Sequence, residues 1–513
     1  MYKSDTICAI ATGMAGSGIG IIRVSGDRAI EICDRIFAGK KRLAEMDTFT
    51  AAYGHIEDRS VADGLTRDET VDEIYRDDYS GRTKGQIIDE VIVLVMKAPH
   101  SYTTEDTVEI DCHGGLFLME KVLKLLIKEG ARIAEPGEFT KRAYLGGRID
   151  MSEAEAVMDM ISAESDRALS ASVGQLSGRL RGKITELREK ILYDTAYIES
   201  ALDDPENYSL DGFGEKMSDD VTEISAEIEK LLGSFDEGRL VKEGIRTAII
   251  GKPNAGKSSV LNMLLMEERA IVTDVEGTTR DTLEEYARLN GVLLKLIDTA
   301  GIRETDDKVE KIGVERAEEN IKDADLILFV VDGARPLDDN DHRIIGSLAG
   351  KNVITLINKE DLPVVIDKNE LITLLRSKTT DNINRNNNST QNNETYNIDK
   401  DQDVSGSLNN MITISAKEGQ GRDELAALIK EMFISGDARG NDQIIISNER
   451  HKNALFDAVE ALKRVKDSID NGLPEDFYTI DLMAAYESLG LITGETLADD
   501  LADKIFAEFC MGK

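Results

Sequence analysis

The sequence predicts a multidomain protein of mixed class, with an α+β domain, a helical domain and an α/β domain. Three observations predict this class. Strand-like and helix-like segments are mixed over about the first 150 residues, and long helical patterns follow them. Strands and helices then alternate from 245 to about 432, before helical patterns return. A chain of 513 residues is long enough for about three such domains.

The first 149 residues are expected to form the α+β domain. The segments TICAIAT and IGIIRV read as strands on either side of a glycine-rich loop, and 87–97 (IIDEVIVLVMK) and VEIDCHG read as two more. The segment GLFLMEKVLKLLIKEG has helical periodicity. A polar stretch around 57–86 is interpreted as an insertion.

Helical patterns occupy 150–243 and 435–513. Ser152 and Glu155 have the spacing of a capping box, and Asp204-Pro205 ends the first long pattern. Apolar residues then recur at helical spacing in three later segments: Val221, Ile224, Ile228 and Leu231; Leu455, Val459, Leu462 and Val465; Leu497, Leu501, Ile505 and Phe509. Because the two helical regions flank the α/β region, we expect one discontinuous helical domain with an α/β domain, 244–434, inserted into it.

The expected core strands of the α/β domain read RTAIIG, LLKLID, LILFVVD, NVITLIN and MITIS, which favours a parallel sheet. Residues 378–409 interrupt this domain and are rich in Asn, Thr, Asp and Ser. They have few apolar side chains to bury, so we expect a disordered surface insertion.

The net charge restricts the partners of the chain. Lys and Arg number 62 and Asp and Glu 98, which gives −36. Such a surface repels phosphate backbones, so RNA would have to meet a local basic patch or the surface of a partner. An acidic cytosolic proteome would produce the same charge. No apolar run is long enough to span a membrane, no signal peptide is evident, and the four cysteines are far apart, so we expect a reduced, cytoplasmic protein.

A phosphate-binding loop follows the strand RTAII. Residues 251–258, GKPNAGKS, fit G-x-x-x-x-G-K-[ST]. In this motif backbone N–H groups converge on phosphate, Lys257 reaches the β and γ oxygens, and Ser258 can ligate Mg²⁺. Alone, the motif would also suit an ATPase.

Three further motifs follow in the order found in GTPases. They are D-T-A-G (298–301), N-K-E-D (358–361) and S-A-K (415–417), each at the end of an expected strand. The Asp361 carboxylate can accept from the N1–H and 2-amino donors of guanine, which adenine lacks, so GTP is favoured over ATP. The candidate GTP-binding residues are Asn254, Ala255, Gly256, Lys257, Ser258, Ser259, Thr273, Asp274, Val275, Glu276, Gly277, Thr278, Thr279, Asp298, Thr299, Ala300, Gly301, Asn358, Lys359, Glu360, Asp361, Ser415, Ala416 and Lys417.

The residue after D-T-A-G is unusual. In Ras-like proteins it is a glutamine that orients the attacking water, whereas Ile302 stands here. Another group must therefore position the water. The segment 273–281, TDVEGTTRD, lies between the first two motifs, and Thr278 or Thr279 is the expected switch threonine that ligates Mg²⁺.

The motifs GKPNAGKSSVLN, TDVEGTTRD, DTAGIRE with VEKIGVERA, and NKED resemble those of the TrmE–Era–EngA group of GTPases. The segments ATGMAGSGIGIIRVSG, SYTTEDTVEIDCHGG, RIAEPGEFTKRAYLGGRIDM and FCMGK narrow the resemblance to the tRNA uridine-modification GTPases. It covers the chain except the insertions near 57–86 and 378–409. It implies a Ras-like P-loop G domain inserted into the helical domain, and an N-terminal domain that binds tetrahydrofolate.

For hydrolysis, the resemblance implies that G domains dimerise across their nucleotide faces and that K⁺ takes the role of an arginine finger. Asn254, Thr273, Val275 and Thr278 would ligate K⁺, while Ser258 and Thr279 would ligate Mg²⁺. Glu310 matches the glutamate that positions water, and it joins Lys257 as a catalytic candidate.

For the modification chemistry, the resemblance implies folate contacts by Arg23, Glu109, Arg148 and the C-terminal Lys513. Arg148 stands where the family often has lysine, so charge is kept but geometry can differ. Cys510 matches a cysteine that the family needs for modification. Taken alone, it would be a small apolar residue closing a helix, a position that disfavours a thiolate.

The implied function is a K⁺-dependent GTP hydrolase, acting on acid anhydrides. With an FAD-dependent partner (MnmG, also called GidA) it forms a 5-carboxymethylaminomethyl or aminomethyl group on the wobble uridine, position 34, of certain tRNAs. The expected carbon donor is 5,10-methylenetetrahydrofolate (or 5-formyltetrahydrofolate), with ammonium or glycine as the nitrogen source and FAD and NADH acting only through the partner. The chain would be a homodimer, with no membrane contact, in a heterotetrameric or larger complex. Two rivals are a ribosome-assembly switch like Era and a folate enzyme with a vestigial G domain.

Overall fold

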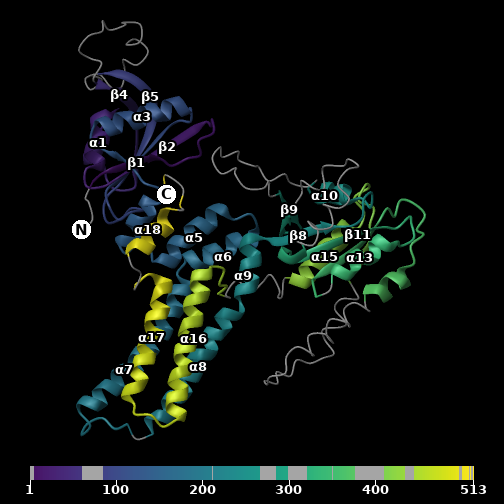
Figure 1. The fold of residues 1–513 in the computed structure, drawn as a ribbon. Helices are drawn as coiled ribbons and strands as arrows, with labels where there is room; N and C mark the ends of the chain where they lie inside the picture. Colours follow the sequence, from purple (N-terminus) through teal and green to yellow (C-terminus); the bar gives the residue numbers. More distant parts are fainter. Residues whose placement is uncertain are drawn as a thin grey trace. The chain divides into compact units, whose positions relative to one another are not determined.

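The computed structural model describes residues 5–59, 85–210, 212–265, 285–297, 321–348, 350–375, 410–433, 444–495, 499–507, 509 and 512 (Figure 1). The chain divides into two compact units. The first contains Met1–Met158, Gln175–Ile224 and Asp457–Lys513, and the second contains Asp159–Gly174 and Ser225–Phe456. The predicted insertion 378–409 lies outside the described residues. Among the described helices, none combines the length and the apolar composition needed to cross a bilayer.

The first unit begins with the predicted α+β fold (Figure 1). Its seven-stranded sheet has the order β3-β4-β5-β6-β2-β1-β7, and every pair is antiparallel except β1 with β7. The strands are β1 (Ile7–Ile10), β2 (Ile19–Ser25), β3 (Phe37–Gly39), β4 (Thr50–Asp58), β5 (Gln86–Met96), β6 (Thr107–His113) and β7 (Arg132–Ile133). The polar segment predicted at 57–86 begins and ends in paired strand, because Glu57 of β4 is opposite Ile87 of β5.

The core of this domain lies between one face of the sheet and two helices, α1 (Ala29–Ile36) and α3 (Leu116–Lys128). Alternate residues of the central strands, such as Ile22, Val24 and Ile110, are fully buried there with Leu126 of α3. This is the period-two pattern that a sheet covered on one face requires. The connections also contain a 3₁₀ turn, η1 (Leu43–Glu45), and α4 (Glu138–Leu145).

Long helices follow the sheet in the sequence. They are α5 (Met151–Ser162), α6 (Asp166–Leu176), α7 (Arg179–Asp203), α8 (Phe213–Gly233), α16 (Glu449–Asp470), α17 (Asp476–Thr493) and α18 (Asp499–Ala507). Val221, Ile224, Ile228 and Leu231 are buried as predicted, as are Leu455, Val459, Leu462 and Val465. In α18 the predicted face is partly wrong, because Leu501 is 43% exposed and Phe506 is buried instead.

The predicted capping box at Ser152 and Glu155 is also wrong by two residues. Ser152 lies inside α5, and Asp150 caps the helix. The Glu153 N–H donates to Asp150 Oδ1 over 2.7 Å, and the Asp150 N–H donates back to Glu153 Oε2 over 2.8 Å. Aspartate caps as well as serine does, so spacing alone did not distinguish the two registers.

The C-terminal helix packs against the N-terminal domain. Phe506 of α18 and the following Phe509 share an apolar cluster with Ala143 of α4 and Met151 of α5. Gly137 has a φ of 67°, and a Cβ there would lie 2.5 Å from the Phe506 carbonyl oxygen. The C-terminal segment therefore contacts α4 and the residues around it within one unit.

The second unit contains a six-stranded sheet of order β13-β12-β11-β8-β10-β9. The strands are β8 (Ile245–Ile250), β9 (Glu285–Leu289), β10 (Val292–Ile297), β11 (Leu326–Asp332), β12 (Val353–Asn358) and β13 (Met411–Thr413). Apolar clusters cover both faces, with α10 (Lys257–Leu265) and α15 (Arg422–Phe433) on one and α13 (Asp339–Ser347) on the other, and α9 (Phe235–Glu243) precedes β8.

The predicted strands are confirmed, and they pair in parallel. The structure adds β9, which pairs antiparallel with β10 at the edge. Asn290 and Gly291 connect them with φ angles of 47° and 81°. Asn-Gly is the sequence signal for such a tight hairpin, and this hairpin was not among the elements predicted from the sequence.

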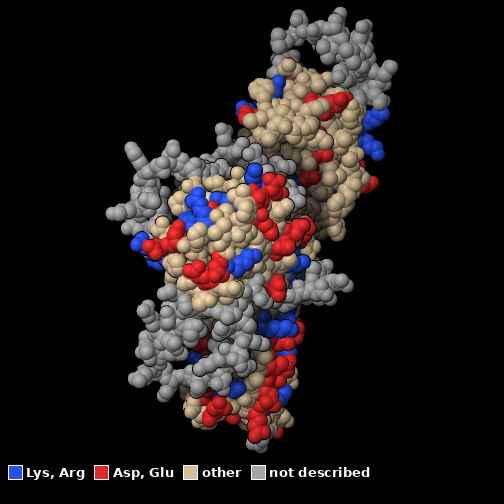
Figure 2. All heavy atoms as spheres, turned by 90° about the vertical axis from the view of Figure 1, so that its right-hand side faces the viewer, with Lys and Arg blue, Asp and Glu red and all other residues tan. Residues whose placement is uncertain are grey.

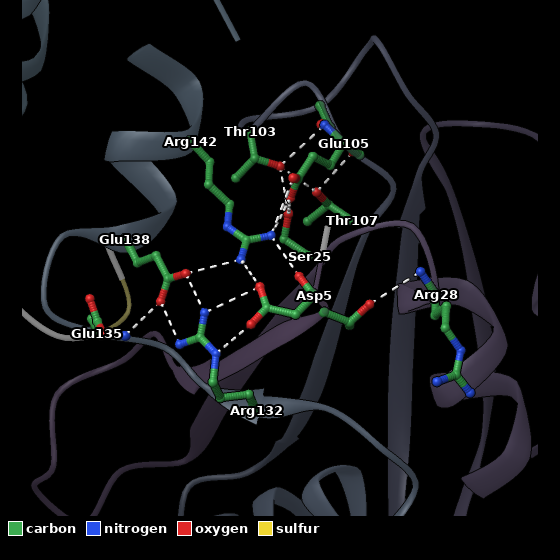
Figure 3. Close-up of polar contacts among 12 residues, drawn as sticks. Asp5, Ser25, Arg28, Thr103, Glu105, Thr107, Arg132, Glu135, Glu138 and Arg142 are labelled. Carbon is green, nitrogen blue, oxygen red and sulfur yellow. Dashed lines mark hydrogen bonds and ion pairs between the residues drawn. The ribbon is translucent and has the colours of Figure 1, made fainter. Parts of the chain in front are cut away.

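An ionic network joins three separate segments of the N-terminal domain (Figure 3). Arg142 of α4 is 2% exposed, and its guanidinium donates to Asp5, Glu105 and Glu138 at 2.9 to 3.0 Å. Arg132 of β7 donates to Asp5 and Glu138, each at 2.7 Å. Hydrogen bonds from Arg132 lower the pKa of Asp5. Burial would raise the pKa of Glu138, but hydrogen bonds from Arg132, the Glu135 N–H and Arg142 outweigh it and lower the pKa.

The lowered pKa values predict acid sensitivity of this domain. Both carboxyls have lower pKa values in the folded state than their ordinary values of 3.8 and 4.5. Their stabilising contribution is therefore complete above those ordinary values and is lost as the pH falls through the lower folded values. We expect Glu138→Gln to lower the melting temperature of this domain near neutral pH and to flatten its decrease below about pH 4, measured by calorimetry. The control is Glu120→Gln, which removes an exposed carboxyl of α3. Parallel curves for Glu138→Gln and wild type would contradict this account.

Candidate functional site

The phosphate-binding loop lies between β8 and α10, at the carboxyl edge of the parallel sheet. Asn254 and Gly256 have φ angles of 63° and 100°, which bend the loop. A Cβ on Gly256 would lie 2.1 Å from the Asn358 Nδ2 atom, so only glycine permits this approach. Ala255 is buried, and Ser258 and Ser259 occupy the first turn of α10. The loop therefore presents a helix N-terminus at the strand ends, which is the geometry of an anion site.

Lys257 folds back over this loop. Its Nζ donates to the carbonyl oxygens of Gly251 at 2.8 Å and Lys252 at 3.0 Å. Burial lowers the pKa of the ammonium group, because the charged form loses hydration. An anion bound in the loop would offset this cost, since it would supply a counter-charge to the buried ammonium.

Asn358 links the loop to the motif that follows β13. Its Nδ2 donates to the Ala255 carbonyl at 2.9 Å, and its Oδ1 accepts from the Ala416 N–H at 3.1 Å. Both donor and acceptor functions of one buried amide are thus used between segments far apart in the sequence. The side chain therefore holds two of the predicted motifs in register.

The rest of the N-K-E-D motif is held by two further contacts. Ser415 Oγ donates to Asp361 Oδ1 at 2.9 Å, which orients the carboxylate that would accept from a base. Lys359, with a φ of 72°, donates to Asp332 Oδ2 at 2.7 Å. Asp332 was not predicted as a site residue from the sequence, although it ends β11 at the same edge of the sheet. Glu360 and Lys417 lie in the same two loops.

The structure thus brings together the P-loop, N-K-E-D and S-A-K predictions. The remaining nucleotide-site predictions lie outside the described residues: Thr273, Asp274, Val275, Glu276, Gly277, Thr278, Thr279, Asp298, Thr299, Ala300, Gly301 and Glu310. The strand that leads to Asp298, β10, is described and pairs in parallel with β8.

A second cluster lies in the N-terminal domain, where three predicted residues gather. Arg23 and Glu109 are opposite each other on β2 and β6, and their side chains form an ion pair of 2.7 Å. The guanidinium carbon of Arg148 lies 4.8 Å from the Tyr102 ring centroid, and that of Arg23 lies 5.3 Å from it. Arg23 is also 5.6 Å from the Phe139 ring centroid.

The aromatic members of this cluster were not predicted from the sequence. Tyr102 and Phe139 sit in segments that were quoted for family resemblance only, SYTTED and GEFTKRA. The Tyr102 ring lies within cation–π distance of two guanidinium groups, and such contacts help to orient both cations. The C-terminus also reaches this cluster, because Arg23 Nη1 donates to the Gly512 carbonyl at 3.3 Å. Cys510 and Lys513 lie outside the described residues.

Comparison with known proteins gives matches to two family models and to full-length relatives. A family model of the MnmE helical domain matches residues 151–510, and one of the GTP-binding protein TrmE N-terminus matches residues 6–148. A tRNA modification GTPase MnmE of Lachnoclostridium phytofermentans is 48% identical, with 100% of both chains covered. The protein of the same name from Acetivibrio thermocellus is 41% identical, again with 100% of both covered.

Among solved structures, translation elongation factor SelB from Methanococcus maripaludis matches 38% of this chain and 34% of its own at 20% identity. Its TM-score is only 0.23, so no conclusion about this chain is drawn from that match. The family follows instead from the matches along the whole chain. Together, the 360-residue helical match, the N-terminal match and the full-length relatives establish that this chain belongs to the MnmE family of tRNA modification GTPases.

Proposed function

We propose that this chain is a GTP hydrolase that takes part in tRNA modification, and that it acts on the wobble uridine. The observation that carries the GTPase part is the Asn358 amide, which holds the phosphate loop and the S-A-K loop at one edge of the sheet. With an FAD-dependent partner of the MnmG type, the product would be the 5-carboxymethylaminomethyl or aminomethyl group at position 34.

GTP would bind with its phosphates on the P-loop and its base at Asp361. The Ser415 hydrogen bond fixes one carboxylate oxygen, and the other can accept from the N1–H and 2-amino groups of guanine. Lys257 would exchange its two carbonyl partners for β and γ oxygens of the nucleotide. The lost hydrogen bonds within the loop are then replaced by charge-assisted ones.

Two of the described residues, Ser258 and Asn254, carry oxygen atoms suited to the proposed metal ions. Ser258, at the start of α10, supplies a hydroxyl of the kind that Mg²⁺ accepts beside phosphate oxygens, and Thr279 is its proposed partner. Asn254 supplies an amide oxygen, a hard ligand suited to K⁺, with Thr273, Val275 and Thr278 proposed alongside. A monovalent cation there would offset charge on the β/γ oxygens. Glu310 remains the proposed residue that positions water, in place of the glutamine replaced by Ile302.

The N-terminal cluster is the proposed site for 5,10-methylenetetrahydrofolate or 5-formyltetrahydrofolate. Glu109 offers a carboxylate for the donor edge of a pterin, and Arg23 and Arg148 offer guanidinium groups for carboxylates of the glutamate tail. The Arg23 contact to Gly512 supports the proposal that Lys513 and the catalytic candidate Cys510 act near this site. GTP hydrolysis would then be a conformational step, separate from bond formation.

The proposed assembly is a homodimer joined to the MnmG partner, which supplies FAD and NADH chemistry. On the face that Figure 2 shows, basic side chains of the described residues form small groups among acidic ones. With a net charge of −36, this supports a partner that provides most of the tRNA surface. The three described cysteines are buried and free, which supports the proposed cytoplasmic location.

The proposed domain division remains 1–149, 150–243, 244–434 and 435–513. The family model that spans 151–510 supports it, since its match begins at the second of these segments and ends near the last residue.

Base selection can be tested at Asp361. Asp361→Asn replaces an acceptor with an amide and mismatches guanine, so we expect GTP affinity to fall on the order of 10⁴-fold. Xanthosine triphosphate, which presents a carbonyl where guanine has an amino group, should bind the variant better than GTP does. The measurement is competition with a fluorescent nucleotide, and Glu418→Gln, an exposed neighbour, is the control. Equal loss of both nucleotides would contradict the assignment.

The cation role can be tested by comparing salts. GTP hydrolysis should be at least about tenfold faster in K⁺ than in Na⁺, because an arginine finger contributes about 10³-fold or more. Asn254→Gly keeps the left-handed backbone and removes the amide oxygen, so it should abolish the difference while GDP still binds. Identical wild-type rates in the two salts would reject the role of Asn254.

The tRNA function can be tested in a deletion strain. Nucleoside analysis of its bulk tRNA should show loss of the modified wobble uridine, and the intact gene should restore it. Cys510→Ser should fail to restore it although the purified variant still hydrolyses GTP. Wobble uridines that are unchanged by the deletion would remove the tRNA assignment.

A further inference from the structure

The Arg142 network and the cluster of Arg23, Glu109 and Arg148 are connected through the segment that carries Tyr102 and Glu105. Figure 3 shows the Arg142 guanidinium pointing toward Glu105 on one side and toward Asp5 and Glu138 on the other. Glu105 belongs to the connection between β5 and β6, and this same connection carries Tyr102. The network therefore connects to the residue that carries the aromatic ring through the short backbone segment from Glu105 to Tyr102, with two residues between them.

The connection that carries Tyr102 is attached to α4 at three points. The Tyr102 hydroxyl is 2.9 Å from Thr140 Oγ1, and Arg142 Nη1 donates to Glu105 Oε2 at 2.9 Å. At the end of α4, a Cβ on Gly146 would lie 2.2 Å from Thr104 Oγ1, so the backbones are in close approach there. Of the three, only the Arg142 contact is an ion pair of a buried side chain.

Hydroxyl groups of Ser25 and Thr103 lie next to Glu105 in this connection. Ser25 Oγ donates to Glu105 Oε2 at 2.8 Å, and Ser25 Oγ and Thr103 Oγ1 are 2.6 Å apart. Thr104 has a φ of 67°, which is unusual for a β-branched residue. A strained backbone persists only where its surroundings hold it in place. Here the ion pair between Arg142 and Glu105 holds the residue next to Thr104.

We infer that Arg142 is a positioning residue for folate binding, because it anchors the Tyr102-bearing connection whose ring orients Arg23 and Arg148. This inference rests on the proposed folate site. Arg142 contacts Asp5, Glu105 and Glu138, and it makes no proposed contact with the ligand. Its effect on affinity would pass through Tyr102, and this route distinguishes positioning from a general contribution to stability.

A double-mutant cycle tests the inference, with 5-formyltetrahydrofolate as the probe and calorimetry on the full chain as the measurement. We expect Arg142→Met to weaken binding by about tenfold, and Tyr102→Leu to weaken it by a similar factor. The double variant should bind no more weakly than Tyr102→Leu alone, because both changes remove the same orientation of the two arginines. Arg142→Lys keeps the charge but not the fork of donors, so it should recover only part of the affinity.

The control is Arg28→Met, which removes an exposed ion pair with Glu31 in the same domain and should leave affinity unchanged. If Arg142→Met does not fold, Glu105→Gln replaces it, since this change weakens the same anchor from the other side. Wild-type affinity in folded Arg142 variants would overturn the inference. Additive losses in the double variant would also overturn it. Absence of binding by wild type would instead overturn the folate site itself.

Discussion

Parallel pairing of the strands in the second unit is the constraint on which the nucleotide site depends. Because β8, β11, β12 and β13 run in the same direction, the residues that follow each strand meet at one edge. The single side chain of Asn358 can then hydrogen-bond to both Ala255 and Ala416. Glycine at position 256 completes the arrangement, since any larger residue would occupy the place of that amide.

The N-terminal domain uses a different principle. Its main apolar core lies against one face of the sheet, a smaller apolar cluster contains Ile7, Ala9 and Phe139, and ion pairs connect the segments that contain Asp5, Glu105 and Glu138. In an acidic chain one arginine can form ion pairs with several carboxylates, as Arg142 and Arg132 do. Buried ion pairs add little net stability, but they require one specific arrangement of their partners. This requirement suits a site that must hold cations and a ring in fixed geometry.

Several features escaped the sequence analysis for identifiable reasons. The β9 strand is polar on one side and short, and its Asn290-Gly291 turn was the only clear signal for it. The α5 cap was assigned to Ser152 because serine and aspartate satisfy the same spacing rule. Asp332 stands at the end of a predicted strand, yet it belongs to no short motif, and only the contact with Lys359 reveals its role.

Hydrophobic period and short-range spacing are local properties, so the sequence alone predicted β1, β2, β5 and β6 of the first unit, the parallel strands of the second, the long helical segments and the order of the nucleotide motifs. It did not predict β3, β4, β7 or β9. It also indicated Arg23, Glu109 and Arg148, through resemblance. The tertiary structure was needed to show that Arg23 and Arg148 both contact the Tyr102 ring, that Glu109 pairs with Arg23, that Gly512 reaches Arg23, and that Arg142 joins three segments. Such contacts link residues up to 489 positions apart, and no local pattern encodes which distant partner a buried charge will meet.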